Sequence, residues 1–150
     1  MPIQGLDEVL SNLESVSGKV QEASIEGMQI GMELIVGRAK EKAPVDTGEL
    51  RNKIVAFSEG ENGEVRAYAE HAPYVEFGTG PVGAASGGKG SGYSTGGWVF
   101  PIGVGKDGKP EFRYTRGQPA RPFLYPAFAE SKGDVAKIIS DKIREAIGGV

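Results

Sequence analysis

The chain contains no cysteine and only one histidine, His71, among its 150 residues. The lack of cysteine excludes disulfide bonds, a thiolate nucleophile and a cysteine-based zinc site. A single histidine cannot form a multi-histidine metal cage, and no serine and aspartate arrangement is evident for it to serve. We therefore expect no metal, no cofactor and no catalytic residue, and folding in a reducing compartment.

Long apolar runs and an excess of basic residues are also absent. No segment has the length of a signal-peptide core or a membrane span, so we expect a soluble protein with no membrane partner. The formal net charge of −3 provides no general attraction to phosphate backbones. An apolar content of 39% is enough for one domain with a modest core, which we expect to span residues 1–150.

Helical periodicity is present near both ends of the chain. Apolar residues recur every three or four positions from Leu6 to Ala39, which predicts a long helix that is bent or interrupted near Gly18. We interpret this stripe as core, with a dedicated partner-binding helix as the alternative. Pro44 requires the helix to end before it. The same spacing predicts a second amphipathic helix over residues 127–147.

Alternating patterns predict two hairpins in the middle of the chain. Residues 54–57 and 65–69 alternate on either side of Asn62-Gly63, a dipeptide that suits a tight reversal. The segments "WVFPI" (98–102) and "EFRYT" (111–115) predict a second hairpin. We expect an α+β fold, in which about four strands form one antiparallel sheet and both helices pack on one of its faces.

Nearly every second residue from Gly78 to Gly97 is glycine. The ordering entropy of such a segment is large and its apolar area is small, so we predict a long flexible loop over residues 78–97. Within it, "GAASGGKG" from Gly83 is close to a phosphate-binding loop. However, Gly90 replaces the serine or threonine that binds magnesium, and no strand precedes the stretch and no helix follows it. Nucleotide binding is not expected.

The stretch "APVDTGELR" (43–51) contains Asp-Thr-Gly, the active-site triplet of aspartic proteases. Such an enzyme needs its aspartate after a hydrophobic strand and opposite a second aspartate, whereas a long helix precedes Asp46. We interpret the stretch as a turn in which Asp46 and Glu49 form a variant capping box before a short helix. A DTG-type aspartic protease is retained as an alternative. The residues assigned to the turn and cap are Pro44, Asp46, Thr47, Gly48, Glu49 and Leu50.

Three sequence blocks occur in a recognisable order: "APVDTGELR" (43–51), "YVEFGTG" (74–80) and "QPARPFLYPAF" (118–128). Together they resemble the minor tail-component, or neck, proteins of long-tailed bacteriophages, which take part in head-tail joining and tail completion. The resemblance runs from about Ala39 to Glu130. It implies a non-enzymatic structural protein of the virion, assembled in the host cytoplasm, whose copies form a ring, with a hexamer as the expectation from the family.

The resemblance implies that the partners are further copies of the chain and other phage neck and tail proteins. It also implies that DNA passes through the ring without specific binding. Protein interfaces favour aromatic residues and arginine, and Arg121 is expected to reach a carboxylate such as Glu76 within or between subunits. Packing in the protein's own core is the alternative, above all for Phe77 and Phe123. The candidate interface residues are Tyr74, Glu76, Phe77, Gly78, Gly80, Arg121, Pro122, Phe123 and Tyr125. A non-virion assembly adaptor or chaperone is the alternative function.

Overall fold

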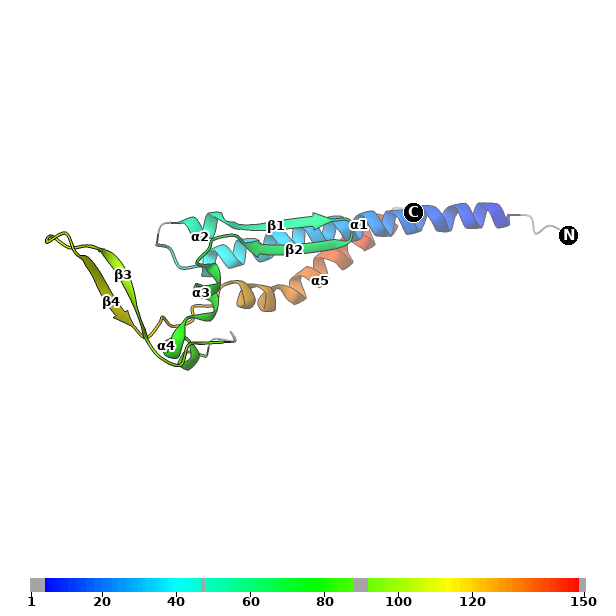
Figure 1. Cartoon of the computed structure of the whole chain (residues 1–150). Coiled ribbons are helices and arrows are strands. Elements are labelled where there is room, and N and C mark those ends of the chain that lie inside the picture. Colours follow the sequence, from blue (N-terminus) through cyan, green and yellow to red (C-terminus); the bar gives the residue numbers. More distant parts are fainter. Residues whose placement is uncertain (1–4, 47, 88–91, 149–150) are drawn as a thin grey trace.

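The computed structural model describes residues 5–46, 48–87 and 92–148. Figure 1 shows an elongated molecule, with the start of α1 at one end and the hairpin β3–β4 at the other. Helices α1 and α5 run antiparallel and side by side between these ends. The elements are α1 (Leu6–Lys42), α2 (Glu49–Asn52), β1 (Ile54–Glu59), β2 (Asn62–Ala67), α3 (Ala72–Phe77), α4 (Gly80–Ala85), β3 (Trp98–Val104), β4 (Pro110–Thr115) and α5 (Leu124–Gly148).

The long N-terminal helix is continuous, and the predicted bend or interruption near Gly18 is wrong. A glycine lowers helix stability by about 1 kcal/mol relative to alanine but leaves the backbone hydrogen bonds intact, so one glycine does not break a helix of this length. The predicted end is confirmed, because α1 stops at Lys42 and Ala43 adopts an extended conformation before Pro44. The second helix is also confirmed, although α5 begins at Leu124, before the predicted start.

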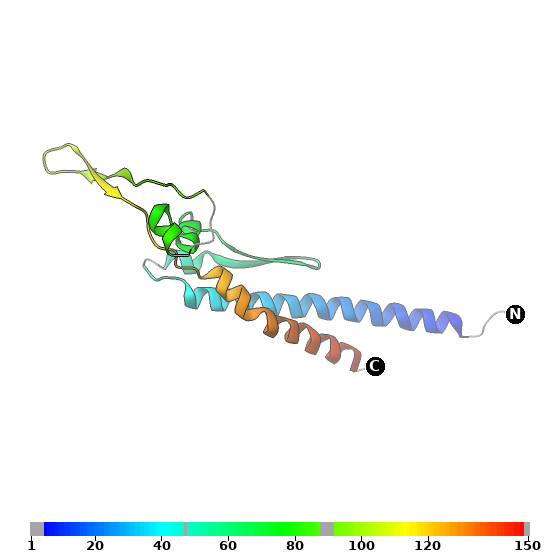
Figure 2. The same ribbon diagram turned by 90° about the horizontal axis from the view of Figure 1, so that it is seen from below.

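Two glycines allow α5 to lie very close to α1. A Cβ atom added at Gly27 would lie 2.8 Å from the Cα of Ile139, and one added at Gly31 would lie 2.7 Å from Val135 Cγ1. Ion pairs flank this contact along the helix pair. They join Arg38 to Asp134, Lys42 to Glu130 and Lys142 to Glu26. The two long helices therefore form the main body of the molecule, as Figure 2 shows.

The first hairpin is confirmed, but its turn lies two residues before the predicted Asn62-Gly63. Glu59 pairs with Asn62, which places Gly60 and Glu61 in the turn, and Gly60 has the positive φ of 58° that suits the first position of a type II′ turn. Gly63 belongs to β2 instead. A Cβ atom at Gly63 would lie 2.4 Å from the sulfur of Met32. A Cβ at this position would displace the Met32 side chain, so Gly63 favours close packing on α1 and is not part of the chain reversal.

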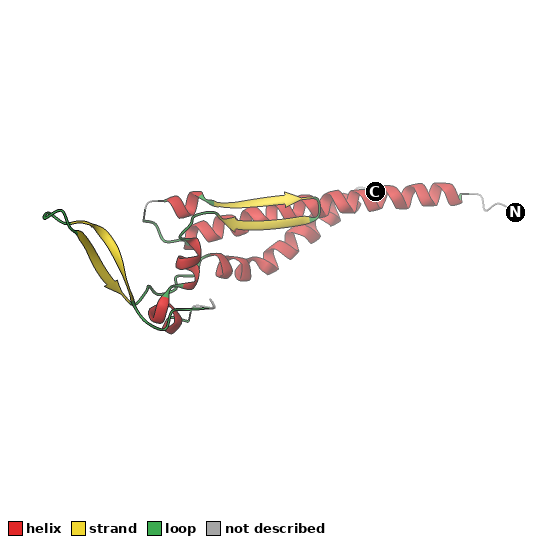
Figure 3. Ribbon diagram, viewed as in Figure 1, coloured by secondary structure: helices red, strands yellow, loops and turns green. Residues whose placement is uncertain are grey.

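The expected sheet of about four strands is wrong, because the chain forms two separate antiparallel pairs, β1–β2 and β3–β4. Figure 3 shows the second pair projecting away from the helices. Of the two long helices, α1 makes the extensive contact with β1–β2, and α5 packs on α1, so the helices do not share one face of a sheet. The physical reason is that α1 already covers β1–β2, while α3 and α4 separate the two hairpins in the chain.

The core lies where the end of α1 meets the first hairpin, α3 and the start of α5. Phe123 and Ile54 are its largest fully buried apolar side chains among the described residues. Leu50 from α2 packs beside them, as predicted for the turn. The core is small, and the N-terminal part of α1 contributes nothing to it: Leu6, Leu10 and Leu13 are all exposed. The interpretation of the whole α1 stripe as core is therefore wrong for this part.

The glycine-rich segment is not the single long loop that the sequence predicts. It contains α4, and a Cβ atom at Gly78 would lie 2.6 Å from the amide nitrogen of Ala120. A Cβ atom at Gly117 would lie 1.8 Å from the carbonyl oxygen of Thr79. Glycine here permits close packing of two chain segments, so its abundance does not indicate mobility before residue 87. Residues 88–91, which include most of the P-loop-like end, lie outside the described part of the chain.

We predict that Gly27→Ala destabilises the protein although alanine favours helix. The added methyl group would meet the backbone of Ile139, and overpacking of this kind costs about 1–3 kcal/mol. Gly37→Ala is the matched control, because Gly37 is exposed on the same helix with nothing within 4 Å of an added Cβ. It should stabilise by about 0.5–1 kcal/mol. Urea unfolding followed by circular dichroism measures both, and equal stabilisation would contradict the close helix contact.

Candidate functional site

The three sequence blocks meet in space. The turn after α1, helix α3 and the segment before α5 together line a cavity of about 480 Å³. Each block contributes side chains, including Asp46 from the first, Val75 from the second and Arg121 from the third. The residues that suggested one family are thus far apart in sequence but neighbours in the fold. Each block also contributes to the core, through Leu50 from the first, Val75 from the second and Phe123 from the third.

The turn between α1 and α2 differs from the predicted capping box. Helix α2 begins at Glu49, and its N-cap is Gly48, in a left-handed conformation with φ of 79°. Asp46 is exposed and lies two residues before this position, and the side chain of Glu49 accepts a hydrogen bond from Lys53 at 2.6 Å. That bond lowers the pKa of Glu49. Asp46 as N-cap is therefore wrong, and Thr47 lies outside the described residues.

Glu76 is the most informative side chain of the site. It is only 7% exposed, and its carboxylate accepts three backbone hydrogen bonds. Oε2 accepts from the amides of Phe123 at 2.7 Å and Leu124 at 2.9 Å, and Oε1 accepts from Tyr125 at 2.9 Å. Phe123 directly precedes α5 and Leu124 and Tyr125 are its first two residues, so these amides have no acceptor within the helix. A buried carboxylate at this end also interacts favourably with the helix dipole.

The predicted pairing of Glu76 with Arg121 within one chain is wrong. The carboxylate is directed at the start of α5, whereas the side chain of Arg121 is exposed at the cavity between the blocks. The backbone of Arg121 has a separate role, because its amide donates to the carbonyl oxygen of Val75 at 2.8 Å. The second and third blocks are therefore joined by backbone hydrogen bonds, by the Glu76 carboxylate and by the side chains of Gln118 and Thr79.

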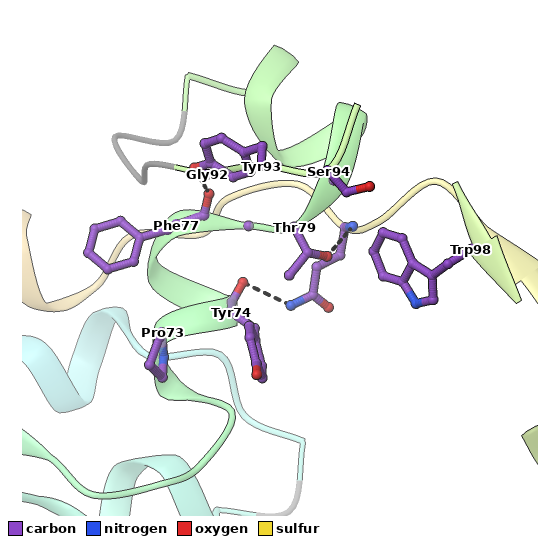
Figure 4. A pocket seen from close by; sticks show the side chains of 11 residues that line it. Pro73, Tyr74, Phe77, Thr79, Gly92, Tyr93, Ser94 and Trp98 are labelled. Carbon is purple, nitrogen blue, oxygen red and sulfur yellow. Dashed lines mark hydrogen bonds between the residues drawn. The ribbon is translucent and has the colours of Figure 1, made fainter. Parts of the chain in front are cut away.

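An aromatic groove lies beside this junction, between α3 and the base of the β3–β4 hairpin (Figure 4). It has a volume of about 1070 Å³ and mostly apolar walls. Gln118 supports one wall by donating from its side chain to the carbonyl oxygen of Tyr74 at 2.9 Å and from its backbone to Thr79 Oγ1 at 3.1 Å. The aromatic side chains that line the groove are Tyr74, Phe77, Tyr93 and Trp98.

The candidate interface residues occupy three different environments. Glu76 and Phe123 are buried, so the core interpretation of Phe123 holds. Phe77 is 41% exposed and does not fit that interpretation. Pro122 and Tyr125 are exposed outside both cavities. The residues that the structure brings together at the aromatic groove are Tyr74, Phe77, Gly78 and Gly80.

Sequence reasoning missed seven of the eleven residues that line the groove, and three of these seven have large side chains in its walls. Tyr93 lies in the segment predicted to be a flexible loop, and Trp98 was placed only in a strand. Gln118 belongs to the third block but was not selected. One sequence signal was available. Tyr93 and Trp98, the single tryptophan of the chain, lie on either side of Gly96 and Gly97, and large aromatic residues in a glycine-rich segment need a packing partner.

The described residues contain neither a metal-binding cluster nor a helix that could span a membrane. Within residues 5–46, 48–87 and 92–148, no three His, Cys, Asp or Glu side chains are grouped so that they could hold a metal ion. No helix in the same ranges combines the length and the apolar character that a membrane span requires. Asp46 follows a helix and not a strand, unlike the aspartate of the protease alternative.

We predict that Glu76→Gln lowers the free energy of unfolding by about 2 kcal/mol, because the new NH₂ group faces amide donors that need an acceptor. Glu70→Gln is the control, since Glu70 is exposed and the change should stay within about 0.5 kcal/mol. Urea unfolding measures both variants. A Glu76→Gln protein as stable as the control would show that the carboxylate does not anchor α5.

The turn gives an independent prediction. Gly48→Ala forces a Cβ into a left-handed conformation and should cost about 1–2 kcal/mol. Asp46→Ala should change stability by no more than about 0.5 kcal/mol, because the residue is exposed and is not the N-cap. If Asp46 and Glu49 formed a capping box, Asp46→Ala would be the more destabilising of the two substitutions. Thermal unfolding of the two variants therefore distinguishes the two descriptions.

Comparison with known proteins finds a match to a family model. Residues 7–78 match the model of a family described as "Bacteriophage HK97-gp10, putative tail-component". The match covers just under half of the chain, from α1 to the end of α3, and includes the first sequence block and residues 74–78 of the second, but not the third. No curated protein and no solved structure matches the chain. Residues 7–78 thus carry the sequence pattern of a phage tail-component family, which agrees with the resemblance drawn from the three blocks together.

Proposed function

We propose that this protein is a structural subunit of the phage neck or the top of the tail, where its copies form a ring that joins or completes the tail for attachment to the head. The observation that carries the proposal is the match of residues 7–78 to a phage tail-component family. The order of the three sequence blocks, which resembles that of neck proteins, supports the finer assignment.

The distribution of apolar side chains supports a subunit that buries surface on assembly. Among the described residues, twenty large apolar side chains are exposed, whereas six are buried: Met32, Ile35, Val36, Leu50, Ile54 and Phe123. Monomeric proteins rarely expose large contiguous apolar patches, and such patches mark protein interfaces. The aromatic groove is one of them, and tyrosine and tryptophan are the residues that dominate binding energy at interfaces.

The proposal assigns no catalytic role and no cofactor. The partners are further copies of the chain, with a hexamer as the expectation from the family, and neighbouring neck and tail proteins. The site of action is the virion, after assembly in the host cytoplasm. DNA passes through the ring without specific binding, because a formal net charge of −3 gives no general attraction to its phosphates.

The test uses the phage that encodes the chain. We expect immunogold electron microscopy to label the head-proximal end of the tail, because the protein remains in the particle. Deleting the gene should yield heads and tails that do not join, and the wild-type chain supplied from a plasmid should restore joining. Particles that never contain the protein, but form only in its presence, would indicate the assembly adaptor instead.

A further inference from the structure

The first turns of α1 carry an apolar stripe that has no packing partner among the described residues. Figures 1 and 2 show α1 extending beyond the end of α5, whose last turns lie beside Lys19 and Glu22. We call residues 6–18 the overhang. Its large apolar side chains are 49–61% exposed, and with Val16 they fall within about one third of the helix circumference. They are Leu6, Val9, Leu10 and Leu13.

The opposite end of the molecule presents a second apolar surface. Paired residues of β3 and β4 share a face, and one face of this hairpin carries no charged side chain. We call it the apolar hairpin face. Phe112 and Tyr114, at its centre, are 61% and 62% exposed. The face consists of Val99, Pro101, Val104, Pro110, Phe112 and Tyr114.

The two surfaces match in length and in charge. The overhang is about 20 Å long at the rise of an α-helix, and β3 is about 23 Å long at the rise of a strand. Residues 6–18 contain three acids, Asp7, Glu8 and Glu14, and no base. Residues 98–116 contain four bases and two acids. Two overhangs would repel each other, as would two hairpins, whereas one of each attracts.

We propose that the overhang of one copy packs on the apolar hairpin face of the next copy, head to tail. An amphipathic helix laid on an apolar strand face is a common way to bury both surfaces. The two surfaces are different and lie at opposite ends of the molecule, so the contact is heterologous, and repeating it generates a ring when the rotation between copies closes. The inference rests on the proposed ring function and assigns the surfaces that join its subunits.

The lack of cysteine allows a direct test. Full-length Leu10→Cys carrying a size tag is mixed with untagged Phe112→Cys and treated with a short bis-maleimide, both as purified protein and in assembled particles. We expect the mixed dimer to be the main product on a denaturing gel. Ser15→Cys, on the opposite face of the overhang, is the matched control and should cross-link to Phe112→Cys several-fold less.

Other products would overturn the proposal. Dominant dimers of Leu10→Cys with itself would show that overhangs pair with one another, and the absence of the mixed dimer from both samples would show that the two surfaces do not meet. If the particles contain the protein but no mixed dimer forms in them, the proposed contact is refuted and the proposed neck function is not. The mixed dimer in purified protein, together with absence of the protein from particles, refutes the neck function alone.

A pair of double variants provides a second measurement. Leu10→Glu with Leu13→Glu should abolish the ring-sized species in light scattering, because the two acids remove the apolar stripe. Ser11→Glu with Ser15→Glu adds the same charge on the other face and should leave a ring-sized species. All four residues are exposed, so neither pair should alter the fold. Rings of unchanged mass from the leucine pair would contradict the proposal.

Discussion

The carboxylate of Glu76 is the interaction on which the architecture depends. It joins α3 to the start of α5 by three backbone hydrogen bonds, and so fixes where the second long helix begins. Phe123, one of the residues held in this way, fills the core against the end of α1. The wall of the aromatic groove on α3 is positioned by the same bonds. A single buried acid, Glu76, therefore links the two long helices to the aromatic groove, one of the surfaces that we propose for assembly.

Much of the fold follows from local patterns. The helical spacing of apolar residues predicted both long helices, Pro44 predicted where α1 ends, and the alternation of side chains along the strands predicted both hairpins. The sequence did not show that the two hairpins form separate sheets. Both faces of β3–β4 carry apolar residues, so the alternation of side chains does not indicate which face would pack on a core. The turn at Gly60 was missed because Asn62-Gly63 is a strong turn signal, and only the contact with Met32 shows why Gly63 lies in a strand.

The site was less predictable than the fold because its determinants are distant in sequence. Glu76 bonds to amides 47 to 49 residues away, and backbone partners leave no trace in residue type. Glycine composition was misleading for a related reason. Gly78 and Gly117 permit close approach of two segments, but in sequence they are indistinguishable from glycines of a flexible loop. The three blocks did indicate which segments matter, although not which side chains act in them.

The close fit of α5 against Gly27 and Gly31 has a mechanical consequence. Side chains interlock at these glycines, and ion pairs toward both ends of α5 favour the same alignment, so sliding one helix past the other by a turn, about 5.4 Å, would bring bulky atoms into collision. The distance by which the free end of α1 projects is thereby set. If the overhang packs on the hairpin of the next copy, as we propose, the fixed alignment of α1 and α5 would determine the distance between neighbouring subunits.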